Sequence, residues 1–89
     1  MFYVGVDLHK QSISLCVVEL AGRERKIIER RRFRCDDEKS MADYFAELGE
    51  YQLVVEATAS YEWFVQLVEP TADRVVLAHP GHLRVFCLI

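Results

Sequence analysis

The sequence predicts an α/β fold: a mixed five-stranded sheet with helices on its faces, in the order βββαβαβ, whose final helix is cut short. Two patterns along the chain predict it. In the first third, apolar and polar residues alternate with the period of a β-strand. In the rest, segments of helical period alternate with short apolar runs, the pattern of strand–helix–strand units with parallel pairing. With 89 residues, the chain is expected to form one domain, 1–89, which is incomplete.

The first half of the chain is expected to form three strands in a meander. Residues 2–7 are apolar as far as Asp7 and predict a short strand buried on both faces. Residues 12–20 alternate apolar and small polar side chains, as a second strand does. Gly22 can adopt the positive φ of a tight turn, so residues 26–34 are predicted to return antiparallel. The arginines of this third strand suit a sheet edge, where charge discourages unwanted pairing.

The second half is expected to alternate helices with strands. A helix is predicted after residue 37, with Asp36 or Asp37 as its N-terminal cap and Gly49 at its end. Its apolar face consists of Met41, Tyr44, Phe45 and Leu48. The remaining elements are predicted at residues 52–56 (strand), 59–69 (helix), 74–78 (strand) and 82–89 (the start of a third helix).

Two carboxylates stand at the ends of predicted buried strands. Asp7 ends the first strand, and Glu56 ends the strand at residues 52–56. If these two strands are parallel neighbours, both acids lie at the same edge of the sheet, where open α/β sheets place functional groups. A shared Mg²⁺ or Mn²⁺ would relieve the repulsion between them. Two structural alternatives stay open: Glu56 could cap the next helix, or either acid could pair with Lys10 or Arg84.

Positive charge is concentrated in one segment. The chain has a net charge of −3, which excludes a uniformly basic nucleic-acid-binding domain. Residues 23–34 nevertheless hold seven of the eleven Lys and Arg residues. Arg30 and Arg32, together with Arg31 and Arg34, could contact the phosphate backbone of DNA or RNA. A solvated strand edge is the structural alternative.

The three cysteines and the hydropathy pattern bear on location. Cys16, Cys35 and Cys87 are odd in number and lack metal-ligand spacing, which is typical of free thiols in a reducing compartment. No run approaches the roughly 18 apolar residues of a membrane span, and no export signal is visible. We therefore expect a cytoplasmic protein with no membrane partner.

Three segments together resemble a known family. They are VGVDLHKQSISL (residues 4–15), VVEATASYE (54–62) and VVLAHPGHLRVF (75–86). In this order and spacing they resemble the N-terminal RuvC-like DEDD catalytic domain of bacterial insertion-sequence transposases, the group that carries a separate C-terminal transposase domain. The resemblance covers essentially the whole chain.

The resemblance implies a ribonuclease H-like fold and a divalent-metal reaction on DNA. It implies that Asp7 and Glu56 are the first two acids of the catalytic tetrad and ligands of Mg²⁺ or Mn²⁺. It also implies DNA cleavage and strand transfer during excision and integration of an insertion sequence. Lys10 would then contact a DNA phosphate near the metal. An element-encoded structured RNA is a further partner that the resemblance suggests.

The chain departs from the family pattern in two places. The family usually continues Glu-Ala-Thr with glycine, where this chain has Ala59. The family's Asp-x-x-Asp pair would lie beyond Ile89, so residues 1–89 are expected to be inactive alone, because a two-metal site normally needs those acids.

The alternative function is that of a non-catalytic remnant that dimerises or binds nucleic acid. An apolar patch left by the short third helix would favour a homo-oligomer. The same fold serves ATP-binding sugar kinases and actin-like proteins, but residues 4–12 contain no glycine-rich phosphate loop.

Overall fold

The computed structural model describes residues 1–56 and 61–78, and the elements follow the predicted order. They are β1 (Phe2–Leu8), β2 (Ser12–Ala21), β3 (Glu24–Arg34), α1 (Glu38–Leu48), β4 (Tyr51–Glu56), α2 (Glu62–Val68) and β5 (Arg74–Ala78). The first residues of the helix predicted at 59–69, and the whole third helix predicted at 82–89, lie outside the described residues. Within the described part, no helix is long and apolar enough to cross a membrane.

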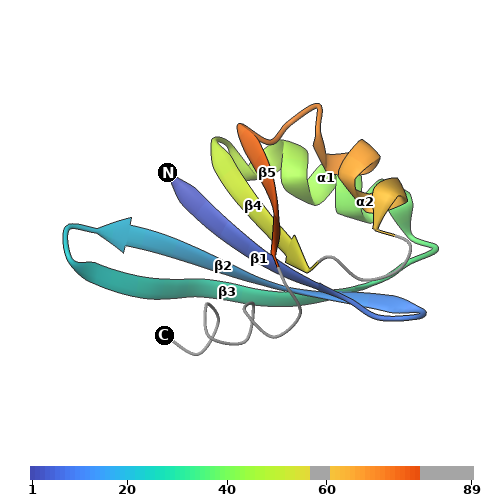
Figure 1. The fold of residues 1–89 in the computed structure, drawn as a ribbon, viewed down its shortest axis with the longest axis horizontal. Coiled ribbons are helices and arrows are strands. Elements are labelled where there is room, and N and C mark those ends of the chain that lie inside the picture. The colour runs from blue at the N-terminus through green and yellow to red at the C-terminus, as the bar shows by residue number, and fades with distance from the viewer. Residues whose placement is uncertain (57–60, 79–89) are drawn as a thin grey trace.

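The five strands form one mixed sheet in the order β3-β2-β1-β4-β5 (Figure 1). The meander β1–β2–β3 is antiparallel, whereas β4 lies parallel to β1 and β5 lies parallel to β4. The predicted five-stranded mixed sheet is therefore confirmed. β1 lies at its centre, which explains the apolar run at the start of the chain, and the arginine-rich β3 lies at an edge, as predicted.

The β2–β3 hairpin is longer than predicted and contains one irregularity. Gly22 has a φ of +65°, and the strands pair as far as the turn, so β3 begins two residues earlier than expected. The register then shifts between Val17 and Val18, which pair with Glu29 and Ile27. Ile28 is the extra residue of a β-bulge. The bulge decides which residues of β3 face which side of the sheet.

Both helices pack on the same side of the sheet (Figure 1). The Asp37 side chain caps α1 by accepting a hydrogen bond from the Ser40 N–H, and Gly49 ends the helix with a φ of +89°, as predicted. Phe45 of α1 and Phe64 of α2 meet edge to face, with ring centroids 5.9 Å apart. Beneath the helices, the core of the sheet consists of Val4, Val6, Ile13, Leu15, Val17, Phe33, Tyr51, Leu53 and Val55.

Candidate functional site

The alternation of side chains along β1 separates the core from the candidate site. Val4 and Val6 are fully buried under the helices. Asp7, the next residue, has the opposite orientation, and its side chain is 44% exposed. A carboxylate at this position therefore avoids the cost of burial in the apolar core.

Glu56 lies next to Asp7 across the parallel pair β1–β4. The ladder pairs these strands as far as Val6 and Val55, and the two acids are the residues that follow. In-register neighbours share a face and lie about 4.8 Å apart between strands. The register thus brings the two residues to the same edge of the sheet, on neighbouring strands. Their role as metal ligands remains a prediction.

The row of polar residues continues across the antiparallel half of the sheet. Asp7 pairs with Ser14 of β2, and Ser14 pairs with Arg32 of β3. Glu56, Asp7, Ser14 and Arg32 therefore form one line across four strands, on one face of the sheet. Arg30 lies on the same face, two residues along β3, opposite Cys16. The predicted nucleic-acid-binding arginines and the predicted acids consequently share a surface.

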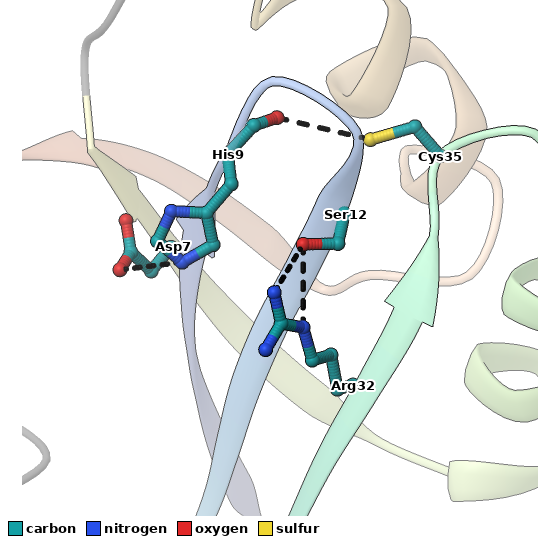
Figure 2. A network of polar contacts seen from close by, with 5 residues as sticks. All are labelled: Asp7, His9, Ser12, Arg32 and Cys35. Atoms are coloured by element: carbon teal, nitrogen blue, oxygen red, sulfur yellow. Dashed lines mark hydrogen bonds and ion pairs between the residues drawn. The ribbon is translucent and has the colours of Figure 1, made fainter.

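The turn between β1 and β2 adds a contact to Asp7 that the sequence did not reveal. His9 places its Nε2 3.2 Å from Asp7 Oδ2 (Figure 2). The turn is held by the His9 N–H, which donates to the Ser12 carbonyl at 2.8 Å, and by the Cys35 thiol, whose Sγ lies 3.8 Å from the His9 carbonyl oxygen. One oxygen of Asp7 is thus engaged by its own turn.

Ser12 is a second residue that the sequence analysis did not single out. The Arg32 guanidinium donates two hydrogen bonds to its Oγ, from Nε at 3.3 Å and from Nη2 at 3.0 Å (Figure 2). A signal was available, because the strand period places Ser12 and Ser14 on the face that carries Asp7. The side-chain hydrogen bond itself depends on the pairing of β2 with β3.

A hollow of about 570 Å³ adjoins this network. Its lining residues are Lys10, Gln11, Ser12, Arg32, Arg34, Cys35 and Asp36. Three of them are cations and one is an acid, so the hollow is positively charged on balance. Asp36 forms a two-pronged ion pair with Arg34, with Oδ1 3.2 Å from Nε and Oδ2 3.0 Å from Nη2.

Arg31 belongs to the other face of the sheet. Its guanidinium carbon lies 5.1 Å from the ring centroids of both Phe33 and Tyr44, and its Nη1 lies 3.2 Å from Glu29 Oε1. The Tyr44 hydroxyl donates to Glu29 Oε2 at 2.9 Å. Arg31 thus helps to fasten α1 to β3 and does not join the arginines on the face of Asp7.

The described cysteines are free thiols, as predicted. Cys16 is buried, and Cys35 lines the hollow. Burial raises the pKa of the Cys35 thiol above its ordinary value, and the negative charge of Asp36 raises that pKa further. Cys35 is therefore a protonated thiol at neutral pH and a poor nucleophile.

The donor set at the two acids fits part of a metal site. Carboxylate oxygens are the ligands that Mg²⁺ and Mn²⁺ prefer, and Asp7 and Glu56 supply them from adjacent strands. Across residues 1–56 and 61–78, no group of three or more Asp, Glu, His or Cys side chains is positioned to hold an ion. The described residues thus offer two ligands and leave the other coordination positions to other groups.

Comparison with known proteins supports the fold but not the narrower family. No family model matches the chain, and no curated protein matches it. Among solved structures, the Fowlpox virus resolvase in complex with substrate Holliday junction DNA superimposes with a TM-score of 0.71 at 12% identity. The superposition covers 91% of this chain and 62% of the resolvase, so this chain spans about three-fifths of that protein. A Ppx/GppA family protein of Aquifex aeolicus gives a TM-score of 0.49 at 14% identity, over 90% of this chain and 35% of that one, which is too low to support any inference.

The chain has a ribonuclease H-like fold. The sheet order, the two helices and the superposition on the resolvase agree on this point. The fold that the transposase resemblance implied is confirmed, whereas no family match supports the transposase assignment itself.

Proposed function

We propose that this chain is the N-terminal part of a DEDD transposase, a metal-dependent enzyme that cleaves DNA and transfers strands during excision and integration of an insertion sequence. The observation that carries this proposal is the β1–β4 register, which sets Asp7 beside Glu56 on one face of the sheet. Neighbouring strands lie about 4.8 Å apart, so residues at these two positions can contribute ligands to one ion. Carboxylate oxygens are the ligands that Mg²⁺ and Mn²⁺ prefer, which supports metal binding at this edge of the sheet.

The surroundings of the two acids support nucleic acid as the substrate. Arg30 and Arg32 share their face of the sheet, and Lys10 follows in the next turn. These side chains are exposed cations of the kind that contact a phosphate backbone. The similarly folded Fowlpox virus resolvase was solved with substrate Holliday junction DNA, which adds support for DNA.

Each predicted residue has a role in this proposal. Asp7 and Glu56 hold the Mg²⁺ or Mn²⁺ ion, and Lys10, Arg30 and Arg32 hold and orient the DNA backbone. When bound, such an ion activates the attacking oxygen or stabilises the leaving oxygen of a phosphodiester. With only two ligands in the described residues, we expect residues 1–89 alone to bind one ion weakly and to cleave no DNA. Mg²⁺-dependent cleavage by this chain that Asp7→Ala abolishes would contradict that expectation.

The metal site is tested by Mn²⁺ binding, measured by paramagnetic broadening of amide NMR signals. In the wild type, signals around Asp7 and Glu56 should broaden first. Asp7→Asn and Glu56→Gln keep the shape of each side chain but remove its charge, and each should abolish the broadening. Glu47→Gln, on the exposed surface of α1, is the matched control and should leave it unchanged. Equal broadening in all four proteins would show that the two acids are structural.

A second candidate function is a non-catalytic module that binds nucleic acid or dimerises. The positively charged hollow favours it, because the hollow needs no metal to bind a phosphate backbone. In this case the chain would bind DNA, or RNA encoded by the element, in EDTA and show no Mn²⁺ site. Dimerisation is tested by light scattering at micromolar concentration, and a monomer there would contradict it.

A further inference from the structure

We infer that the hollow between the β1–β2 turn and the end of β3 is a phosphate-binding site in which Asp36 occupies the place of a backbone phosphate. The inference extends the proposed function, because it assumes that the ligand of this face is DNA. It assigns roles to Ser12, Arg34 and Asp36, which the proposed function leaves unused.

The hollow combines cations with rigid hydrogen-bond donors. Lys10 lines it from the β1–β2 turn, and Arg32 and Arg34 line it from the end of β3. Arg32 is held in place by its two hydrogen bonds to Ser12 Oγ, and the Ser12 hydroxyl keeps its own hydrogen for donation to a ligand. The turn is fixed by the backbone, since the Cys35 N–H donates to the Gln11 carbonyl at 2.9 Å. Arg32 and the backbone of the turn are therefore held in place before any ligand arrives.

The Arg34–Asp36 pair has the geometry of an arginine–phosphate contact. The guanidinium presents Nε and Nη2 to two oxygens of one carboxylate, which is the fork that arginine also offers to phosphate. Both side chains are exposed, Arg34 at 81% and Asp36 at 68%. Water therefore screens the attraction between their charges, and the ion pair is weak. A phosphate that also meets Lys10 and Arg32 gains contacts that the Asp36 carboxylate lacks. Exchange of Asp36 for a backbone phosphate is therefore favourable.

The position of the hollow suits a DNA strand that passes the two acids. Ser12 and Arg34 are the next pair on this face, two residues along the strands from Ser14 and Arg32. β3 lies two strands from β1. At about 4.8 Å per strand, the hollow is roughly 10 Å across the sheet from Asp7. That distance corresponds to a few nucleotides of one strand. A phosphate held there would fix the register of the strand relative to the carboxylates.

The test is the binding of a short fluorescein-labelled DNA duplex, followed by anisotropy in EDTA over a series of salt concentrations. Arg34→Gln should weaken binding and lower the slope of log affinity against log salt by about 0.9, equally on two duplexes of unrelated sequence. Arg34→Lys keeps the charge but not the fork, so it should weaken binding less. Asp36→Asn removes the competing carboxylate and should strengthen binding severalfold.

The matched control is Arg25→Gln, which removes an exposed arginine near the hairpin turn, at the other end of β3. It should change affinity and salt slope less than Arg34→Gln does. A second readout is alkylation of Cys35 by iodoacetamide, located by peptide mass mapping, which the duplex should slow. Thermal melting of each variant checks that it is folded.

The outcomes separate this inference from the proposed metal site. If Arg34→Gln and Arg25→Gln behave alike, or if Asp36→Asn weakens binding, the hollow is not a phosphate site. If the wild type does not bind the duplex in EDTA, the inference is also wrong, while the Mn²⁺ experiment still decides the metal site. If Mn²⁺ binding fails but Arg34 and Asp36 respond as expected, the phosphate site stands without the catalytic proposal.

Discussion

The two faces of the sheet are built from alternate residues of the same strands, and near the end of β1 they carry opposite chemistry. On the helix face, Val4 and Val6 of β1 and Phe33 of β3 are buried beneath α1 and α2. On the other face, Asp7 and Arg32 belong to one polar row. Val6 and Asp7 are adjacent in the chain, and so are Arg32 and Phe33.

This difference shows how a small domain can carry a charged site without losing its core. The helix face supplies the apolar burial that stabilises the fold. The residues of the polar row are at least partly exposed, so their charged groups remain solvated and reduce the stability of the fold little. Substitutions on the helix face should therefore affect stability, and substitutions in the polar row should affect binding.

The largest expected effect comes from exchanging two neighbours between the faces. In the double variant Arg32→Phe with Phe33→Arg, the composition is unchanged, but a guanidinium must enter the core in place of a ring that is 8% exposed. We expect a loss of at least about 3–5 kcal/mol in the free energy of unfolding, measured with urea. The single variant Arg32→Gln is the control and should lose less than about 1 kcal/mol. Near-native stability of the double variant would show that β3 can change its register.

A smaller effect is expected from two adjacent residues of β1. Val6→Ala removes two methyl groups from a fully buried position and should cost about 1–3 kcal/mol. Asp7→Asn should cost less than about 1 kcal/mol, because it changes an exposed contact with His9. Chemical denaturation of both variants provides the comparison. Equal losses would mean that Asp7 has a structural role that its exposure does not reveal.

The smallest effect concerns the polar contact that fastens α1 to β3. Burial, the hydrogen bond to Glu29 and the charge of Glu29 raise the pKa of Tyr44 to about 12 from 10.0, while Arg31 lowers it in part. Since the folded state holds this proton more tightly, the stabilisation is complete below pH 10 and is lost as the pH rises from 10 towards 12.

Tyr44→Phe should remove the part of the loss of stability at alkaline pH that comes from ionisation of Tyr44. Urea unfolding at pH 9 and pH 11 should show a smaller drop for this variant than for the wild type. Glu29→Gln keeps the ring buried but removes the carboxylate, so it should have an intermediate drop. Parallel losses in all three proteins would exclude Tyr44 as their source.

Much of the fold could be predicted because it depends on local pattern. The apolar face of α1, the Asp37 cap and Gly49 are properties of short segments, and all appear as expected. The alternation predicted along residues 12–20 appears as far as Leu15, whereas Cys16 and Val18 are buried as well. Asp7 and Glu56 could be singled out for the same reason, since each follows a run of apolar residues. That their strands are parallel neighbours was a condition in the sequence analysis, which the structure supplies.

The sequence by itself therefore determined the order of the elements and the two acids at the ends of apolar strands. Only the tertiary structure decided which arginine faces Asp7. Regular pairing from the Gly22 turn would set Arg31 opposite Ser14 and turn Phe33 away from the core. The bulge at Ile28 corrects this by one residue, because Phe33 must pack beneath α1, and Arg32 consequently joins the polar row. The hollow depends on the same pairing, because Ser12 lines it from β2 and Arg32 and Arg34 line it from β3.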